Sequence, residues 1–288
     1  MANGRAPARQ PYLDGGYRIG AMQPASPIPV AVLGASGRMG RAILRLLADD
    51  AALVPVAAVD VAAGEASVPF FPTLADALAA TSPALVIDFS APSSVASTVE
   101  ALAPTSVRWV LGTTGLDEAA MAAVCTLAAT RPVLQASNMS LGVTLLSALV
   151  ERAATVLRGR GYDCEITERH HRLKKDAPSG TALTLGEAAA RGFGLDLAAS
   201  RRDGRSGLVG ARPAGEIGFH AIRGGDILGD HAVLFAADGE MLELSHRLTS
   251  RDTLARGALF AARWLAGVAA PGLYSMADAL DLDGRRRP

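Results

Sequence analysis

Residues 28–50 read IPVAVLGASGRMGRAILRLLADD, and this stretch decides the fold. It begins with a short apolar run containing β-branched residues, which is typical of a buried strand. After a glycine-rich turn, the apolar residues fall on one side of a helix, at Ile43, Leu44, Leu46 and Leu47. The stretch therefore predicts a strand, a tight turn and a helix in direct succession.

The same alternation continues through the next ninety or so residues. Apolar, strand-like runs lie at 53–60, 84–90, 107–115 and 131–138, with helix-like segments at 74–81 and 117–130. Short apolar strands that alternate with helices predict the α/β class and a Rossmann-like, doubly wound parallel sheet. Polar or glycine-rich residues follow three of the strands, at Ser90, at Gly112 to Gly115, and at Ser137 and Asn138. We expect them at the carboxyl edge of the sheet, where ligands bind.

The pattern changes after Asn138. A long helix is predicted over 141–159, a strand over 162–171, a helix over 179–194, strands within 215–226, 231–240 and 241–250, and a last helix over 251–267. The order predicts a second, α+β domain with a mixed or antiparallel sheet.

Four segments follow from these patterns. We expect a disordered N-terminal extension (1–27), a dinucleotide-binding domain (28–138), a substrate-binding and oligomerisation domain (139–249), and a C-terminal helix that returns to the dinucleotide-binding domain (250–288). The alternative for residues 1–27 is an over-called start, with Met22 as the first residue. The apolar runs between Phe219 and Leu248 exceed what one small domain buries, which predicts a homo-oligomer.

Composition argues against several classes of protein. The 28 basic and 28 acidic residues cancel, so no net charge favours nucleic acid or an anionic membrane as a partner. No apolar run approaches the ~20 residues of a membrane span. The two cysteines, Cys125 and Cys164, lack a disulfide or zinc spacing and are expected to be buried, reduced thiols in the cytoplasm.

The glycine turn is a candidate phosphate-binding site. Gly34, Gly37 and Gly40 follow a G-x-x-G-x-x-G spacing between strand and helix. Glycines there let a pyrophosphate approach the helix N-terminus, and Asp60, twenty residues after Gly40, can accept from the ribose hydroxyls of NAD. The alternatives are a turn with a purely structural role and an acid that only caps its strand.

Residues 168–182, ERHHRLKKDAPSGTA, hold two of the five histidines. Neighbouring residues of a strand point to opposite faces, so His170 and His171 are poorly placed to share a metal, and no third ligand has suitable spacing. Together with Lys174 they indicate a pocket for an anion that contains a proton donor. Gly180 and Thr181, in the first turn of a helix, would add donors for a carboxylate. The alternative is a solvated basic loop.

These motifs occur together with DFS (88–90), GTTG (112–115), SNMSLGV (137–143) and RGGDILGDH (223–231), in this order. The sequence thereby resembles the 4-hydroxy-tetrahydrodipicolinate reductase family, also called dihydrodipicolinate reductase, from Pro29 to the C-terminus. The segment HHRLKKDAPSGTA is specific to that family, whereas the glycine turn occurs in many enzymes.

The resemblance implies an activity, a pathway and an assembly. The family reduces a cyclic dicarboxylate, 4-hydroxy-tetrahydrodipicolinate, to tetrahydrodipicolinate with NADH or NADPH, and water is lost. The reaction belongs to lysine and diaminopimelate biosynthesis in the cytoplasm. The enzyme is usually a homotetramer joined through the sheet of its second domain.

The resemblance also implies roles for residues. His170 would donate a proton, with Lys174 as a second catalytic residue, while His171, Gly180 and Thr181 would bind substrate. The implied cofactor residues are Gly34, Ala35, Ser36, Gly37, Arg38, Met39 and Asp60 around pyrophosphate and ribose, and Gly112, Thr113, Thr114, Ala136, Ser137, Asn138 and Met139 beside the nicotinamide. No metal is implied.

Two positions depart from the pattern of the family. Val61 stands where members that favour NADPH often carry Arg, and Met139 where some members have an aromatic residue. Three alternatives stay open at this point. They are a nicotinamide-dependent dehydrogenase acting on another small acid, a cofactor-binding regulator without turnover, and a zinc hydrolase.

Overall fold

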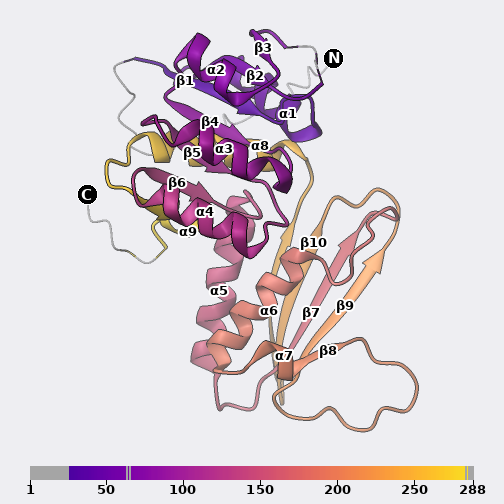
Figure 1. Cartoon of the computed structure of the whole chain (residues 1–288). Coiled ribbons are helices and arrows are strands. Elements are labelled where there is room, and N and C mark those ends of the chain that lie inside the picture. Colours follow the sequence, from indigo (N-terminus) through magenta and orange to yellow (C-terminus); the bar gives the residue numbers. More distant parts are fainter. Residues whose placement is uncertain (1–25, 63, 65, 283, 285–288) are drawn as a thin grey trace, which may run out of the picture.

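A computed structural model describes residues 26–62, 64, 66–282 and 284. The predicted disordered extension, residues 1–27, lies outside the described residues except for its last two. Figure 1 shows two sheets, one above the other, with the long helix α5 (Leu141–Leu157) running down from the first to the second. No helix in the described part of the chain is long and apolar enough to span a membrane.

The first sheet contains seven strands within the described residues, and all of their pairings are parallel. Their order is β12-β6-β5-β4-β1-β2-β3. The strands are β1 (Ile28–Leu33), β2 (Leu53–Val59), β3 (Phe70–Phe71), β4 (Leu85–Asp88), β5 (Arg108–Leu111), β6 (Pro132–Gln135) and β12 (Gly272–Tyr274). The chain changes direction between β1 and β4, so the carboxyl ends of these two strands flank the crevice where such sheets bind ligands.

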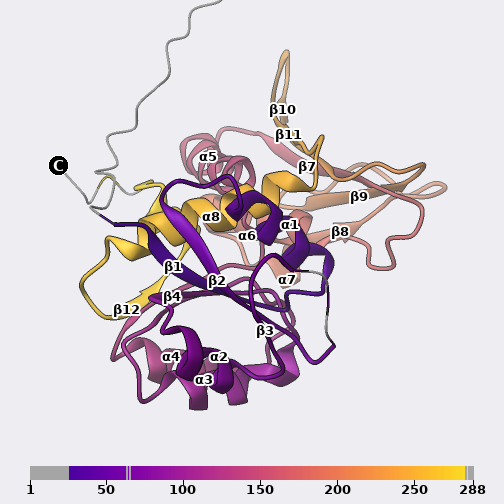
Figure 2. The same ribbon diagram turned by 90° about the horizontal axis from the view of Figure 1, so that it is seen from above.

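Helices cover both faces of this sheet. Helices α2 (Leu74–Thr81), α3 (Val95–Leu102) and α4 (Glu118–Ala128) lie on one face, and α1 (Arg38–Leu47) and α8 (Asp252–Ala266) on the other (Figure 2). The arrangement confirms the predicted doubly wound parallel sheet. The strands at its two edges, β3 and β12, were not predicted. The expectation of two buried cysteines was wrong for Cys125, which is exposed because α4 turns it away from the sheet, whereas Cys164 is buried.

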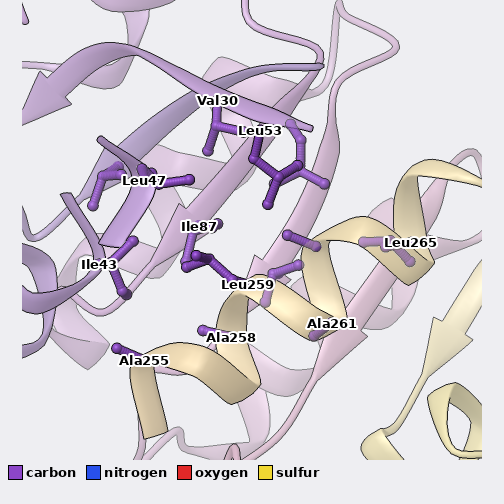
Figure 3. Close-up of a cluster of buried hydrophobic side chains, with 14 of the residues drawn as sticks. Val30, Ile43, Leu47, Leu53, Ile87, Ala255, Ala258, Leu259, Ala261 and Leu265 are labelled. Carbon is purple, nitrogen blue, oxygen red and sulfur yellow. The ribbon is translucent and has the colours of Figure 1, made fainter. Parts of the chain in front are cut away.

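Helix α8 comes from the end of the chain, yet it completes the core around α1. Its Ala258 and Leu259 pack with Ile43 and Leu47 of α1 and with buried apolar residues of the first sheet (Figure 3). A Cβ at Gly257 would overlap the carbonyl oxygen of Met139, so glycine lets α8 lie directly on the loop that follows β6. Helix α8 thus helps to set the position of a loop at the ligand edge of the sheet.

The second sheet has the order β11-β10-β7-β9-β8. Its strands are β7 (Asp163–His170), β8 (Arg201–Asp203), β9 (Ile217–Arg223), β10 (Asp230–Ala237) and β11 (Glu240–Arg247). Strand β10 pairs antiparallel with β7 and β11, whereas β9 pairs parallel with β7 and β8, which confirms a mixed sheet. Strand β8 was not predicted.

Only one face of the second sheet is covered by helices. Helices α5 and α6 (Gly180–Phe193) pack together, and their apolar residues share a core with Ile166, Phe219 and Phe235 of the sheet. Two short helices, α7 (Leu197–Ser200) and α9 (Met276–Ala279), and a 3-10 turn over Pro92–Ser94 complete the described structure. On the opposite face, which we call the open face, Ile222 and Met241 are 45% and 74% exposed.

Candidate active site

The glycine turn takes the form expected of an anion-binding turn. Gly34 has a φ of +80°, and a Cβ there would lie 2.5 Å from the carbonyl oxygen of Phe89. A Cβ at Gly40 would overlap the carbonyl of Gly34, so α1 can pack directly against the turn only with glycine there. Gly37 precedes α1 and provides no side-chain cap, which leaves the first N–H groups of the helix available to a ligand.

Asp60 is bound to this turn. One carboxylate oxygen accepts from the backbone N–H of Ser36 at 3.0 Å and the other from that of Val61 at 2.8 Å. These contacts give Asp60 a capping role at the end of β2, which was the alternative to a ribose contact. Each oxygen has a second lone pair, so the contacts still allow ribose hydroxyls to donate to it. The side chain of Val61 beside it is 95% exposed.

A buried carboxylate organises the loops after β4 and β5. Asp88 is fully buried and accepts from the backbone N–H and hydroxyl of Ser90, at 2.9 and 2.5 Å, and from the hydroxyl of Thr113 at 3.2 Å. The indole of Trp109 is a fourth donor, at 3.3 Å. Burial raises the pKa of Asp88 above its ordinary value in spite of these donors. Asp88 belongs to the DFS motif, but no function was predicted for it from the sequence.

The residues implied beside the nicotinamide separate into two groups. Thr114, Ala136, Ser137 and Asn138 line a cavity of about 970 Å³ between the first sheet and the α5–α6 pair. The other three are not among the residues that line it. Thr113 is buried against Asp88, a Cβ at Gly112 would overlap the ring of Phe89, and Met139 is only 2% exposed within the core under α8.

Strand β7 brings two chemically important side chains to its covered face. Burial alternates along the strand, and Glu168 and His170 fall on the buried side. His170 Nδ1 lies 2.6 Å from Glu168 Oε2, and the two guanidinium nitrogens Nη1 and Nη2 of Arg223 each donate to Glu168 at 2.7 Å. Glu168 was not predicted as a site residue. The alternation of the strand, which puts residues i and i+2 on one face, was the available signal.

The beginning of α6 is tied to the same carboxylate. Ser179 is the N-cap, with its hydroxyl accepting from the N–H of Ala182 at 3.2 Å, and its own N–H donates to Glu168 at 3.0 Å. The hydroxyl also lies 3.1 Å from Nε2 of His231, another residue that the sequence did not single out. Gly180 is exposed and has open space where a Cβ would lie.

The predicted substrate residues surround the cavity from the side of the second sheet. His170, Lys174, Gly180 and Thr181 all line it. Lys174 forms an ion pair with Asp176 at 2.9 Å. His171 does not line this cavity but an adjoining one of about 210 Å³, which it shares with His170, Lys174, His231 and His246. Four of the five histidines thus meet beside one cationic side chain.

Burial governs the charge of His170 and His231. It lowers the pKa of His170 below the ordinary value, although the neighbouring Glu168 opposes the shift. Burial, with a smaller effect from His170, lowers the pKa of His231 to about 4. For Glu168, burial alone would raise the pKa, but hydrogen bonds from Arg223 and His170 outweigh it, and the carboxyl stays ionised. Near neutral pH the free protein thus presents His170 and His231 as neutral imidazoles.

Metal ligation finds no geometric support in the described part of the chain. No group of three His, Cys, Asp or Glu side chains there is placed to hold a metal ion. The Nδ1 atoms of the two neighbouring histidines differ in their contacts, since His170 Nδ1 is engaged by Glu168 and His171 Nδ1 is buried without a partner among the described residues.

Two family models match the chain. "Dihydrodipicolinate reductase, N-terminus" matches residues 28–139, and "Dihydrodipicolinate reductase, C-terminus" matches residues 142–280. The 4-hydroxy-tetrahydrodipicolinate reductase of Thiobacillus denitrificans is 47% identical over 267 residues, which cover 88% of this chain and 99% of the relative. The corresponding reductase of an Anaeromyxobacter species is 45% identical, over 90% and 100% of the two chains.

Solved structures show the same fold. A dipicolinate-bound dihydrodipicolinate reductase from Paenisporosarcina sp. TG-14 superposes with a TM-score of 0.73 at 24% identity, over 88% of this chain and 98% of that one. The diaminopimelate (DAP) dehydrogenase of C. glutamicum, in complex with DAP, superposes with a TM-score of 0.53 at 13% identity, over 91% and 100%. At these identities the likeness concerns the fold alone.

Proposed function

The chain belongs to the dihydrodipicolinate reductase family, and we propose on that premise that it reduces 4-hydroxy-tetrahydrodipicolinate to tetrahydrodipicolinate with loss of water. The electron donor is NADH or NADPH, and the reaction serves lysine and diaminopimelate biosynthesis. The observation that carries the proposal is the cavity of about 970 Å³, in which Thr114 and Asn138 of the first sheet's ligand edge face His170, Lys174 and other predicted substrate residues.

The glycine turn fits a nicotinamide dinucleotide. The uncapped N-terminus of α1 offers N–H groups to a pyrophosphate, and the missing Cβ at Gly34 and Gly40 lets the turn pack closely. Asp60 would accept from ribose hydroxyls, and Thr114, Ser137 and neighbouring residues would border the nicotinamide. When bound, the cofactor supplies a hydride.

The chain's own residues supply charge and a proton. Lys174 attracts a carboxylate of the dianionic substrate, and the N–H groups of Gly180 and Thr181 lie in the first turn of α6, where a helix has no carbonyl partners for them. Two substrate carboxylates beside His170 oppose the effect of burial and raise its pKa, so the imidazole takes up a proton as substrate binds. Nε2 then donates that proton as the hydride arrives.

The assembly and location are part of the same proposal. We infer a homotetramer that covers the open face of the second sheet, because Ile222 and Met241 leave apolar area exposed there. We further propose three parts for the chain after residue 27: a dinucleotide-binding domain (28–138), a substrate-binding and oligomerisation domain (139–249), and a C-terminal segment that returns to the first domain (250–288). We also propose a cytoplasmic location. Light scattering at micromolar concentration that gave the monomer mass would contradict the assembly.

Steady-state kinetics test the reaction directly. Freshly generated 4-hydroxy-tetrahydrodipicolinate is supplied with NADH or NADPH, and oxidation of the cofactor is followed by absorbance. Turnover with this substrate, and none with linear imino acids, is the expected result. Turnover only with a linear imino acid would replace the proposal by an amino-acid dehydrogenase activity.

A further inference from the structure

Strand β7 carries two glutamates with similar partners on opposite faces. Glu165 faces the open side, where His220 Nε2 lies 2.7 Å away and Arg205 and Arg212 donate to it. Glu168 lies on the face covered by helices, with His170 and an arginine as partners. The two sites are built alike, but only one of them adjoins the proposed reaction site.

We propose that Glu168 is a positioning residue for the reduction: it fixes the ring of His170 with Nε2 toward the cavities and favours the protonated ring. The proposal rests on the proposed function, because it assigns the proton at Nε2 to that reaction.

The geometry identifies the atom that carries the transferable proton. An ionised carboxylate only accepts, so His170 Nδ1 must donate to Glu168 at 2.6 Å, and the neutral ring has its lone pair at Nε2. His170 lines both cavities, and a Cβ at Gly229 would lie 3.3 Å from Nε2. Glycine at this position therefore leaves Nε2 uncovered, and protonation of the ring occurs there.

The charges around His170 explain why a carboxylate is needed. Lys174 in the loop after β7 and Arg223 on β9 both disfavour a protonated ring, and the ring of His231 on β10 lies 5.1 Å away between centroids. Glu168 is the one carboxylate within hydrogen-bond or ion-pair distance of His170 in the described structure. Without it, the imidazolium would be buried with no anionic partner in contact.

Arg223 and Ser179 keep the proton on the histidine. Glu168 is 1% exposed and accepts from both guanidinium nitrogens of Arg223 and from the N–H of Ser179. A carboxylate with so many donors is poorly able to accept a proton itself. Arg223 also donates to the carbonyl oxygen of Asp176 at 2.6 Å, and Asp176 pairs with Lys174, so one arginine connects both predicted catalytic residues.

The test is Glu168→Gln, which keeps the side chain's shape and removes its charge. Two quantities are measured: steady-state kinetics across pH, and the protonation of His170 followed by ¹⁵N NMR of the imidazole nitrogens. We expect kcat to fall about 100-fold with little change in KM for the cofactor. We also expect His170 to become protonated only at lower pH than in the wild type.

Glu165→Gln is the matched control, because it removes a carboxylate with the same kinds of partner from the other face of the same strand. We expect it to leave kcat and the titration of His170 unchanged. Glu168→Asp keeps the charge and should restore part of the titration shift, and it also serves as the test if the glutamine variant does not fold.

Two outcomes would overturn the positioning role: unchanged kcat in a folded Glu168→Gln protein, or a His170 titration identical to that of the wild type. A loss of thermal stability with an unchanged titration would leave Glu168 a purely structural anchor. The NMR measurement does not need turnover. If the wild type fails to reduce 4-hydroxy-tetrahydrodipicolinate, the proposed function fails, while the titration still decides whether Glu168 controls His170.

Discussion

Asn138 and Thr181 are joined by a hydrogen bond in which the Asn138 amide donates to the Thr181 hydroxyl at 3.1 Å. Asn138 follows β6 at the ligand edge of the first sheet, and Thr181 lies in the first turn of α6, 43 residues later. The sequence implied a cofactor contact for one and a substrate contact for the other. Because the two side chains touch, the predicted cofactor contact and the predicted substrate contact lie side by side on one continuous surface of the larger cavity.

Removing the hydroxyl tests this surface. Thr181→Val loses both the acceptor for Asn138 and a donor to a substrate carboxylate, and one hydrogen bond to a charged group is worth about 1.5–3 kcal/mol. We expect KM for the substrate to rise about tenfold or more, with a smaller effect on kcat. Thr126→Val, an equivalent change on the exposed surface of α4, should have normal kinetics. A normal KM in Thr181→Val would exclude this hydroxyl from substrate binding.

His170→Gln should remove the proton donor. We expect kcat to fall by about 10²–10⁴-fold, because this is the usual contribution of a general acid. The affinity for NADH, measured by calorimetry, should be nearly unchanged, since the glycine turn lies on the other sheet. His220→Gln, which alters the histidine paired with Glu165 on the open face, is the control. Near-wild-type turnover without His170 would remove it from the mechanism.

Binding of a dicarboxylate should be accompanied by proton uptake. The pKa of His170 is low in the free protein, and two carboxylates beside the ring would raise it, so a proton enters at pH values between the free and bound pKa. We therefore expect dipicolinate to bind more tightly as the pH falls from about 8 to about 6. Calorimetry in two buffers of different ionisation enthalpy measures the uptake directly. His170→Gln should abolish most of it, and uptake that persists in this variant would assign the proton elsewhere.

Cofactor choice should respond to residue 61. Asp60 repels the 2′-phosphate of NADPH, and Val61 beside it is exposed, so an arginine there has room to reach that phosphate. One charge-assisted contact is worth about 1.5–3 kcal/mol, or roughly 10- to 150-fold in the ratio of kcat/KM values. We expect the wild type to use NADH at least as well as NADPH and Val61→Arg to shift the ratio toward NADPH. Strong preference of the wild type for NADPH would show that Asp60 does not face the ribose.

Stability should fall on mild acidification because of His231. Its pKa is about 4 in the folded protein and about 6.5 in the unfolded chain, so between these values the unfolded state binds more protons. Stability is therefore highest above pH 6.5 and decreases as the pH falls toward 4, by an amount on the order of 3 kcal/mol. Urea unfolding of wild type and His231→Gln at several pH values measures this. The variant should show the shallower decrease, and equal slopes would contradict the assignment.

Local patterns predicted most of the fold. The glycine turn, the alternation of strands and helices, and the helix predicted over 179–194 all follow from neighbouring residues, and each corresponds to an observed element. The strands that were missed, such as β3 with two residues and β12 with three, are too short to show any periodicity. They form because their backbones pair with strands β2 and β6 of the sheet. This pairing depends on the tertiary structure and not on the local sequence.

The candidate site was also predicted where its residues are close in sequence and missed where they are distant in sequence. The motif at 168–182 identified the residues around the larger cavity because its members are close in sequence. The contacts of Glu168 with Arg223 and of Ser179 with His231 join residues 55 and 52 positions apart. They depend on the register of β7 with β9 and β10, which sequence patterns do not specify.

The position of α8 has a consequence for protein synthesis. Ala258, Leu259 and Leu265 complete a core that begins with Ile43 and Leu47, more than two hundred residues nearer the N-terminus. A ribosome adds about 5–20 residues per second, so the apolar face of α1 waits on the order of ten to forty seconds for its partner. The half of the protein translated first is therefore among the last to close, and a nascent chain that stops before α8 presents that face to chaperones.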